Sequence, residues 1–552
     1  MDPRVKPAGD GQDRWINFTA TCSKNRHERC LSPGLAVAIE DKLCNHAYVP
    51  PAFEDQTMLR TGDEYLAALR DGRRVYVGGE RVADVTAHPA FRNTARSFAR
   101  IYDRKREAQN LAAMSFVEGE ERFTSWFLVP KSRKDLEQRA ECHRRVAEWS
   151  YGLLGRSPDH VPAFIGGMAM VPDLFEANRK GFGRNVIEYF NYLKLRDLFA
   201  CYLVLTPQGS RDPKMYTDTA TTNPALAVVS EDSEGIVVSG LKLLGTSAVF
   251  SDEAWIGSMI PLGPDQIDEA VTFAIPINHP GVEIWVRESF ELRAPNRIDH
   301  FFSSQFDESD GVMVFDNARV PWSRVFCHRD IPLMRDMYFK TPAHVMGNHQ
   351  SNWRFAEKLK LVVGIAHRAC EMAGVINIPA IQQTLGRLAA AEASLLGLMA
   401  AQIDQLQSIA NGHVHVNRRF LYAALQWCAN NYAQVAEEVR SLMGAGPFLL
   451  PADTSVFDNP ETRQTFEKYW RLPTASADER YKFVKMAWDL LGSDFAGRHT
   501  QYEKFYGGPP HIMDLYSFFN CPWSERRAAV DQIIKDMGSA EDLIASRKSA
   551  AE

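Results

Sequence analysis

Residues 235–244 read GIVVSGLKLL, a short run of apolar and β-branched residues that Gly245 follows. Runs of this kind predict β-strands. Six more occur nearby, separated by turn residues, at 201–205, 225–230, 254–260, 271–275, 282–285 and 311–315. Short strands at this spacing are typical of a compact β-barrel or sandwich, and we expect a β-barrel over residues 199–328.

Helical patterns flank these strands on both sides. Thr61 and Glu64 form a capping box that predicts a helix over 61–71, and a further helix is expected over 135–155. Between them, residues 74–82 carry the Gly78-Gly79 pair of a two-residue hairpin. These signals predict a mainly helical N-terminal domain at 58–198.

The C-terminal part, residues 329–552, is expected to form a helical bundle. Apolar residues recur at helical spacing over 354–373, 381–406, 418–442 and 479–491. Small residues between 388 and 398 permit close helix contact, so this bundle is the expected core of a homotetramer. The predicted fold class is α+β and mostly α. Residues 1–57 lack periodicity and are predicted to be a disordered or mis-assigned extension.

Composition excludes several function classes. The formal net charge of −6 gives no electrostatic argument for nucleic acid or an anionic membrane as partner. No apolar run reaches the length of a membrane span. The nine cysteines include no Cys-x-x-Cys, so no metal site is expected, and reduced thiols favour a cytoplasmic protein.

Three polar motifs, at residues 155–160, 245–248 and 492–499, combine small residues with hydrogen-bonding side chains. Their sequences are GRSPDH, GTSA and GSDFAGRH. Small residues let a ligand approach the backbone, and Arg, Thr and Ser hold its polar atoms. Each motif alone also fits an ordinary turn, strand end or helix terminus. Together they indicate a large organic cofactor that several parts of the chain contact.

The chain from about residue 58 to 509 resembles the two-component 4-hydroxyphenylacetate 3-hydroxylase family, the large oxygenase subunit that uses reduced flavin. The resemblance rests on five stretches in family order: Arg60–Leu66, Asp84–Asn93, the 155–160 motif, Phe306–Glu308 with Val320–Trp322, and Gly492–Glu503. It implies an acyl-CoA dehydrogenase-like fold, FADH2 as cofactor and O2 as co-substrate.

The resemblance also implies where the flavin binds. The expected contacts are Tyr202, Leu203, Val204, Gln208, Gly209, Ser210, Arg211, Thr246, Ser247, Ser493, Asp494, Phe495, Ala496 and Arg498. Arg211 and Arg498 are suited to phosphate or ribose groups. No Gly-x-Gly-x-x-Gly pattern follows a predicted strand, so a separate NAD(P)H:flavin reductase is expected to supply the reduced cofactor.

The expected active site departs from the phenylacetate enzymes. In those enzymes an Arg, a Tyr four residues later and a His at the barrel entry hold the phenol. Here Arg156 is kept, and His160 and Tyr202 occupy the other two positions. This pattern looks closer to the chlorophenol and nitrophenol branch. The implied reaction is hydroxylation of a small phenol through a flavin C4a-hydroperoxide. A halo- or nitrophenol is the favoured substrate, release of its substituent is left open, and 4-hydroxyphenylacetate hydroxylation is the alternative.

Phenol chemistry needs a cation for the phenolate and a base for the proton. Arg156 is the expected cation. Histidine titrates near working pH, and the candidates for the base are His160, His300, His344 and His349.

Two rival functions are an acyl-CoA dehydrogenase- or dehydratase-like flavoenzyme and a non-catalytic flavin- or aromatic-binding protein. The related 4-hydroxybutyryl-CoA dehydratases need cysteines for an iron–sulfur cluster. The segments 156–160 and 328–369 contain no cysteine, which argues against such a cluster.

Overall fold

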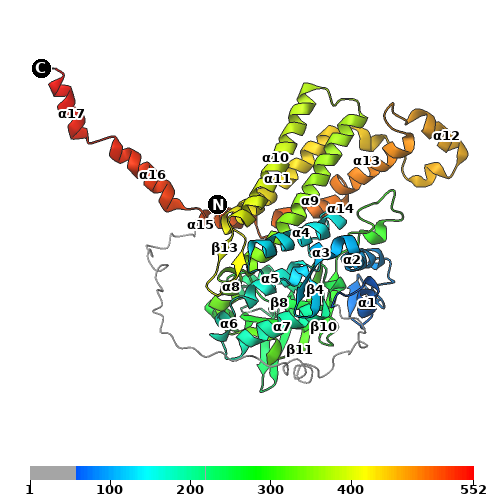
Figure 1. The fold of residues 1–552 in the computed structure, drawn as a ribbon. Coiled ribbons are helices and arrows are strands. Elements are labelled where there is room, and N and C mark those ends of the chain that lie inside the picture. Colours follow the sequence, from blue (N-terminus) through cyan, green and yellow to red (C-terminus); the bar gives the residue numbers. More distant parts are fainter. Residues whose placement is uncertain (1–57, 218, 552) are drawn as a thin grey trace. The chain divides into compact units, whose positions relative to one another are not determined.

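The computed structural model describes residues 58–217 and 219–551, drawn in colour in Figure 1. The extension predicted for residues 1–57 lies outside these ranges. Within them, no helix combines the length and the apolar character needed to cross a membrane.

The N-terminal region is mainly helical, as expected. Its helices are α1 (Gly62–Ala68), α2 (Arg92–Arg104), α3 (Ala108–Met114), α4 (Arg133–Trp149), α5 (His160–Ala169), α6 (Asp173–Glu176) and α7 (Phe182–Arg196), and its strands are β1 (Val75–Val77), β2 (Glu80–Val82), β3 (Ser115–Glu118) and β4 (Glu121–Thr124). The capping box of Thr61 and Glu64 starts α1. Helix α4 ends earlier than predicted, because Tyr151 and Gly152 both adopt positive φ, at 55° and 67°.

All seven strands predicted in the middle region are present, and an eighth follows them. They are β5 (Ala200–Leu203), β6 (Ala227–Glu231), β7 (Gly235–Lys242), β8 (Glu253–Ile256), β9 (Val271–Pro276), β10 (Val282–Val286), β11 (Gly311–Pro321) and β12 (Val325–His328).

The predicted barrel is wrong, because the described strands form two open sheets. One sheet has the order β2-β1-β10-β11-β7-β6 and the other β12-β9-β8-β5. The outer edge of β10 pairs in parallel with β1, with Val75 opposite Ile284. The larger sheet therefore continues into the N-terminal hairpin instead of closing on the smaller sheet. A single bridge, Leu205 to Leu243, joins β5 to the end of β7.

Long helices dominate the C-terminal region. They are α8 (Ile331–Phe339), α9 (Ala343–Met372), α10 (Pro379–Asp404), α11 (Arg418–Met443), α12 (Pro460–Tyr469), α13 (Ala477–Leu491), α14 (Asp494–Phe505), α15 (Pro510–Phe519), α16 (Trp523–Asp536) and α17 (Ala540–Ser549), with a small ribbon of β13 (Gln407–Ser408) and β14 (Val414–His415). The four predicted helices correspond to α9, α10, α11 and α13. Figure 1 shows α9, α10 and α11 running side by side.

Helix α9 links the bundle to the N-terminal helices. It packs on α4 and α5 as well as on α10 and α11. One continuous hydrophobic cluster joins the regions, with Phe98, Phe250 and Phe355 among its buried members. Since these three rings come from α2, the segment after β7 and α9, a single core holds all three regions together. The domain boundaries expected at 198/199 and 328/329 stay predictions.

Helix α9 carries a glycine, Gly347, where it packs tightly against Phe164 of α5. A Cβ on Gly347 would lie 1.9 Å from the ring of Phe164, whereas a Cβ on Gly364 in the same helix would have no neighbour within 4 Å. Gly347→Ala should therefore lower the free energy of unfolding by about 1–3 kcal/mol through overpacking. Gly364→Ala should leave it unchanged or raise it by up to about 1 kcal/mol through helix propensity. Urea unfolding of both variants checks this, and equal shifts would contradict the close packing.

Candidate active site

The three polar motifs meet at one buried residue, Glu308. Its Oε1 accepts a hydrogen bond from the backbone N–H of Arg156 at 2.7 Å, and its Oε2 accepts one from Nη1 of Arg498 at 2.8 Å. Its carbonyl oxygen accepts the backbone N–H of Ser247 at 2.9 Å. The segments predicted to share a ligand therefore lie together in the fold.

Asp310 extends this network. Its two oxygens accept hydrogen bonds from Thr246 Oγ1 at 2.7 Å, from Arg498 at 2.7 and 2.9 Å, and from Arg287 at 2.9 Å. Burial alone would raise the pKa of Asp310, but the two guanidinium groups lower it well below its ordinary value. Arg498, expected to hold a phosphate, is thus already paired with two carboxylates.

Arg156 differs from Arg498 in having no carboxylate partner among the described residues. Its Nη1 donates to His160 Nε2 at 2.6 Å, and its Nη2 donates to the carbonyl oxygen of Tyr506 at 3.1 Å. Its guanidinium carbon lies 4.0, 5.0 and 5.9 Å from the ring centroids of Tyr506, Tyr202 and Tyr502. Burial raises the pKa of Tyr506 to about 12. The guanidinium therefore sits in a cage of tyrosine rings, and Tyr506 remains an uncharged phenol at neutral pH.

His160 is neutral in this arrangement. Burial, and then the charge of Arg156, lower the pKa of His160 well below its ordinary value. Because arginine can only donate, Nε2 must accept and Nδ1 carries the ring proton. His160 is the first residue of α5, and its ring lies 5.1 Å from both Tyr202 and Phe164.

Helix α14 supplies a face that sequence reasoning missed. Arg498, Tyr502 and Tyr506 follow one another at intervals of four, so they share one side of the helix up to its C-cap. A Cβ on Gly155 would lie 2.3 Å from Tyr502 Oη, which explains the small residue at that position. The i, i+4 spacing of these side chains is the sequence signal that would have found them.

A second buried ion cluster fixes α14 to α9. Glu503 accepts from Arg354 at 2.7 and 2.5 Å and from Lys358 at 2.5 Å. Arg354 also donates to the carbonyl oxygen of Gly152 at 2.9 Å. Burial lowers the pKa of Lys358 to about 8, with Glu503 opposing that shift. These contacts fix both the helix that carries the tyrosines and the turn before Arg156.

The site also has polar atoms ready for a ligand. Ser247 Oγ, His160 Nδ1 and Tyr502 Oη are buried and have no hydrogen-bond partner among the described residues. Native proteins rarely leave buried polar atoms unpaired. These three belong to the segments that surround Glu308, so they fit a ligand with several polar atoms, as a flavin ring has.

The remaining expected flavin residues lie in three places. Tyr202, Leu203 and Val204 are on or just after β5, and Gln208–Arg211 form a short turn in which Gln208 and Arg211 are exposed. Ser493 caps α14, with Phe495 and Ala496 buried behind it. Asp494 is exposed and pairs with Arg293.

The other histidine candidates have different surroundings from His160. The Nδ1 of His344 is 2.9 Å from Tyr422 Oη, and its pKa is lowered to about 3 by burial and then by Arg418. Nε2 of His349 accepts from Trp353, and burial lowers the pKa of His349 well below its ordinary value. His300 is half-buried in the segment after Asp299. Among the described residues, His160 hydrogen-bonds to Arg156 and these three histidines do not.

Both halves of the chain match one family. Residues 61–327 match the 4-hydroxyphenylacetate 3-hydroxylase N-terminal region, and residues 334–535 match the C-terminal region of the same family. The chain belongs to the 4-hydroxyphenylacetate 3-hydroxylase family. The resemblance recognised from the sequence motifs is thereby confirmed.

Relatives within this hydroxylase family carry several activities. The chain is 31% identical over 469 residues to the oxygenase component of 4-nitrophenol 2-monooxygenase from Rhodococcus sp, covering 83% of this chain and 88% of that one. It is 30% identical over 463 residues to the oxygenase component of 4-hydroxyphenylacetate 3-monooxygenase from Escherichia coli, covering 81% and 86%.

Solved structures agree with this assignment. The oxygenase component of a 4-hydroxyphenylacetate 3-monooxygenase, crystallised with FAD and 4-hydroxyphenylacetate, superposes with a TM-score of 0.80 at 27% identity, over 87% of this chain and all of that one. A 4-hydroxybutyryl-CoA dehydratase from N. maritimus shares the fold at 17% identity, with a TM-score of 0.73 over 83% of this chain and 91% of that one.

The two active-site arginines should behave differently on removal. Arg498→Ala leaves Glu308 and Asp310 buried without their main cation, which should lower the free energy of unfolding by about 3 kcal/mol or more. Arg156→Ala leaves no carboxylate unpaired, so we expect a loss of about 1 kcal/mol, with phenol turnover abolished. Thermal and urea unfolding measure both effects. Equal destabilisation by the two changes would contradict this division of roles.

Proposed function

We propose that this chain is the oxygenase component of a two-component monooxygenase that hydroxylates a small phenol with FADH2 and O2. Membership of the 4-hydroxyphenylacetate 3-hydroxylase family supports a flavin-dependent phenol monooxygenase. The observation that carries the proposal is the half-buried guanidinium of Arg156, which pairs with no carboxylate among the described residues and is caged by three tyrosine rings.

Such a guanidinium favours an anionic oxygen. In a buried site a cation without a counter-ion strongly stabilises an incoming phenolate, because little water screens the charge. The hydrogen bond to neutral His160 is the one that a substrate oxygen would replace. The rings of Tyr202, Phe164 and Tyr506 provide aromatic walls around it.

His160 would then receive or share the phenol proton. When the substrate oxygen binds to Arg156, Nε2 of His160 is released as an acceptor, while Nδ1–H remains a donor. With its pKa lowered by burial and by Arg156, His160 is a weak base. A weak base suits a phenol that is itself acidic. This argument favours a nitro- or halophenol over 4-hydroxyphenylacetate, which remains the alternative substrate.

The chain's residues fit reduced FAD beside this site. Tyr202–Val204, Thr246 with Ser247, and Ser493–Ala496 would hold it, and the unpaired Ser247 Oγ would meet its polar edge. When bound, FADH2 reacts with O2 and supplies the oxygen atom that enters the ring. Arg498 would act indirectly, by holding Glu308 and Asp310 in place behind Thr246.

The relatives' names and the free cysteines support a proposed partner and a proposed compartment for the enzyme. A separate NAD(P)H:flavin reductase would deliver FADH2, as the words "oxygenase component" in the relatives' names imply. The described cysteines are all free thiols, five of them buried, which supports a reducing compartment such as the cytoplasm.

Activity on a panel of phenols tests the function. With FADH2 and O2, product mass should rise by one oxygen atom, or show exchange of a halide or nitro group for hydroxyl, and 4-nitrophenol or 4-chlorophenol should give a higher kcat/KM than 4-hydroxyphenylacetate. NADH alone should support little turnover until a reductase is added.

His160→Gln should lower kcat at least about tenfold, whereas His344→Gln, which keeps a polar group beside Tyr422, should not. Clear preference for 4-hydroxyphenylacetate would contradict the substrate assignment.

We also propose that the chain assembles as a homotetramer. Large apolar side chains on α15 and α16 are exposed, including Phe519, Ile533, Ile534 and Met537. Exposed apolar groups on this scale are typical of protein interfaces.

Light scattering of the purified protein should give the mass of four 62.2 kDa chains. Ile533→Asp with Ile534→Asp should reduce that mass, while Leu195→Asp, at an exposed apolar position on α7, should not. An unchanged mass in the double variant would show that α16 is not the interface.

A further inference from the structure

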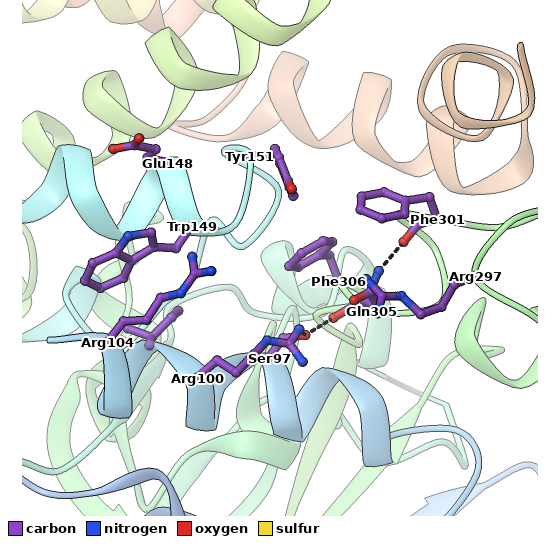
Figure 2. A pocket seen from close by; sticks show the side chains of 11 residues that line it. Ser97, Arg100, Arg104, Glu148, Trp149, Tyr151, Arg297, Phe301, Gln305 and Phe306 are labelled. Carbon is purple, nitrogen blue, oxygen red and sulfur yellow. Dashed lines mark hydrogen bonds between the residues drawn. The ribbon is translucent and has the colours of Figure 1, made fainter. Parts of the chain in front are cut away.

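A cavity of about 270 Å³ lies beside the active site and has no part in the proposed reaction. Helix α2, the end of α4, the Tyr151 turn and the segment 297–306 line it. Figure 2 shows Arg104 and Trp149 on one side of this cavity and Arg297 and Phe301 on the other, with Tyr151 and Phe306 between them.

Three arginines of the lining, Arg100, Arg104 and Arg297, lack a carboxylate partner within 4 Å among the described residues. Arg100 donates to Ser97 Oγ at 2.7 Å. The guanidinium carbon of Arg104 lies 5.8 Å from the ring centroid of Trp149, and that of Arg297 lies 5.5 Å from the ring centroid of Phe301.

The one acid in the lining, Glu148, is bound elsewhere. It accepts from Arg144 at 3.1 Å. Burial, followed by the charges of Arg297 and Arg104, lowers the pKa of Arg100. The charges of Arg104 and Arg297 therefore repel that of Arg100, and an anion would relieve that repulsion.

The walls of the cavity are aromatic. Tyr151 contacts Phe301 and Phe306 edge-to-face, with ring centroids 6.0 and 5.8 Å apart. Tyr151 lies at the end of α4 with a positive φ of 55°, and this turn directs its ring toward Phe301 and Phe306. Aromatic faces and arginines together recognise a ring that carries negative charge.

The cavity is separate from the expected flavin contacts. None of its lining residues is among those expected to hold the cofactor. It shares two segments with the active site, however. The turn at Tyr151 continues to Arg156, and Phe301–Phe306 continues to Glu308.

We propose that this cavity is a second binding site, which takes an aromatic ring bearing a phosphate or carboxylate group. Its volume is close to the lower end of the range for ligand pockets, so it suits a mononucleotide or a monocyclic aromatic acid rather than a dinucleotide. Binding is electrostatic in part and weakens as salt concentration rises.

Calorimetry on the full-length protein saturated with reduced FAD under anaerobic conditions tests the proposal. Adenosine monophosphate and benzoate are the two probes, and whichever binds more tightly identifies the source of the anion. We expect saturable binding of one molecule per chain. Arg297→Gln and Arg100→Gln should each weaken it about tenfold, while Arg96→Gln, an exposed arginine on the same helix, should leave it unchanged.

Two results would overturn the proposal: no saturable binding of either probe at millimolar concentration, or an equal loss in the Arg96→Gln control. Arg297 is exposed, so its variant is expected to fold, and unfolding midpoints check this. Phenol turnover measured on the same samples separates this site from the proposed function, because either can fail while the other holds.

Discussion

Glu308 is the group on which the arrangement of the active site depends. Its side-chain oxygens and its carbonyl tie the turn before α5, the segment after β7 and helix α14 to one point. Each segment comes from a different region of the chain, so this residue connects all three. A buried carboxylate is costly without partners and strongly directional with them. The geometry of the site is therefore fixed by charge as much as by apolar packing.

Two arginines near Glu308, Arg498 and Arg156, have different roles. Arg498 satisfies Glu308 and Asp310 and has little capacity left for a ligand. Arg156 bonds to Glu308 only through its backbone N–H, and its guanidinium lies within the tyrosine cage. The cage holds a positive charge in place without neutralising it. Such preorganisation is what a developing phenolate needs, because no residue has to reorient when the charge appears.

Much of the fold could be predicted from the sequence, since strand and helix periodicities are local. The seven strands and four long helices expected from apolar spacing are present. Sheet closure could not be predicted, because β1 pairs with β10 across more than two hundred residues, and no local pattern encodes that partner. The three motifs were found because their residue types are distinctive. Glu308 as their common partner, and Tyr502 and Tyr506 as the cage, were missed because acids and tyrosines acquire such roles only through tertiary contacts.

The parallel pairing of β1 with β10 also has a consequence for biosynthesis. The hairpin of residues 75–82 is among the first parts of the described chain to be translated, yet its partner strand emerges only after residue 286. Until then one edge of the hairpin has unpaired backbone groups. Non-local pairings of this kind are slow to form and leave intermediates prone to aggregation. The pairing of β1 with β10 can therefore form only after translation has passed residue 286.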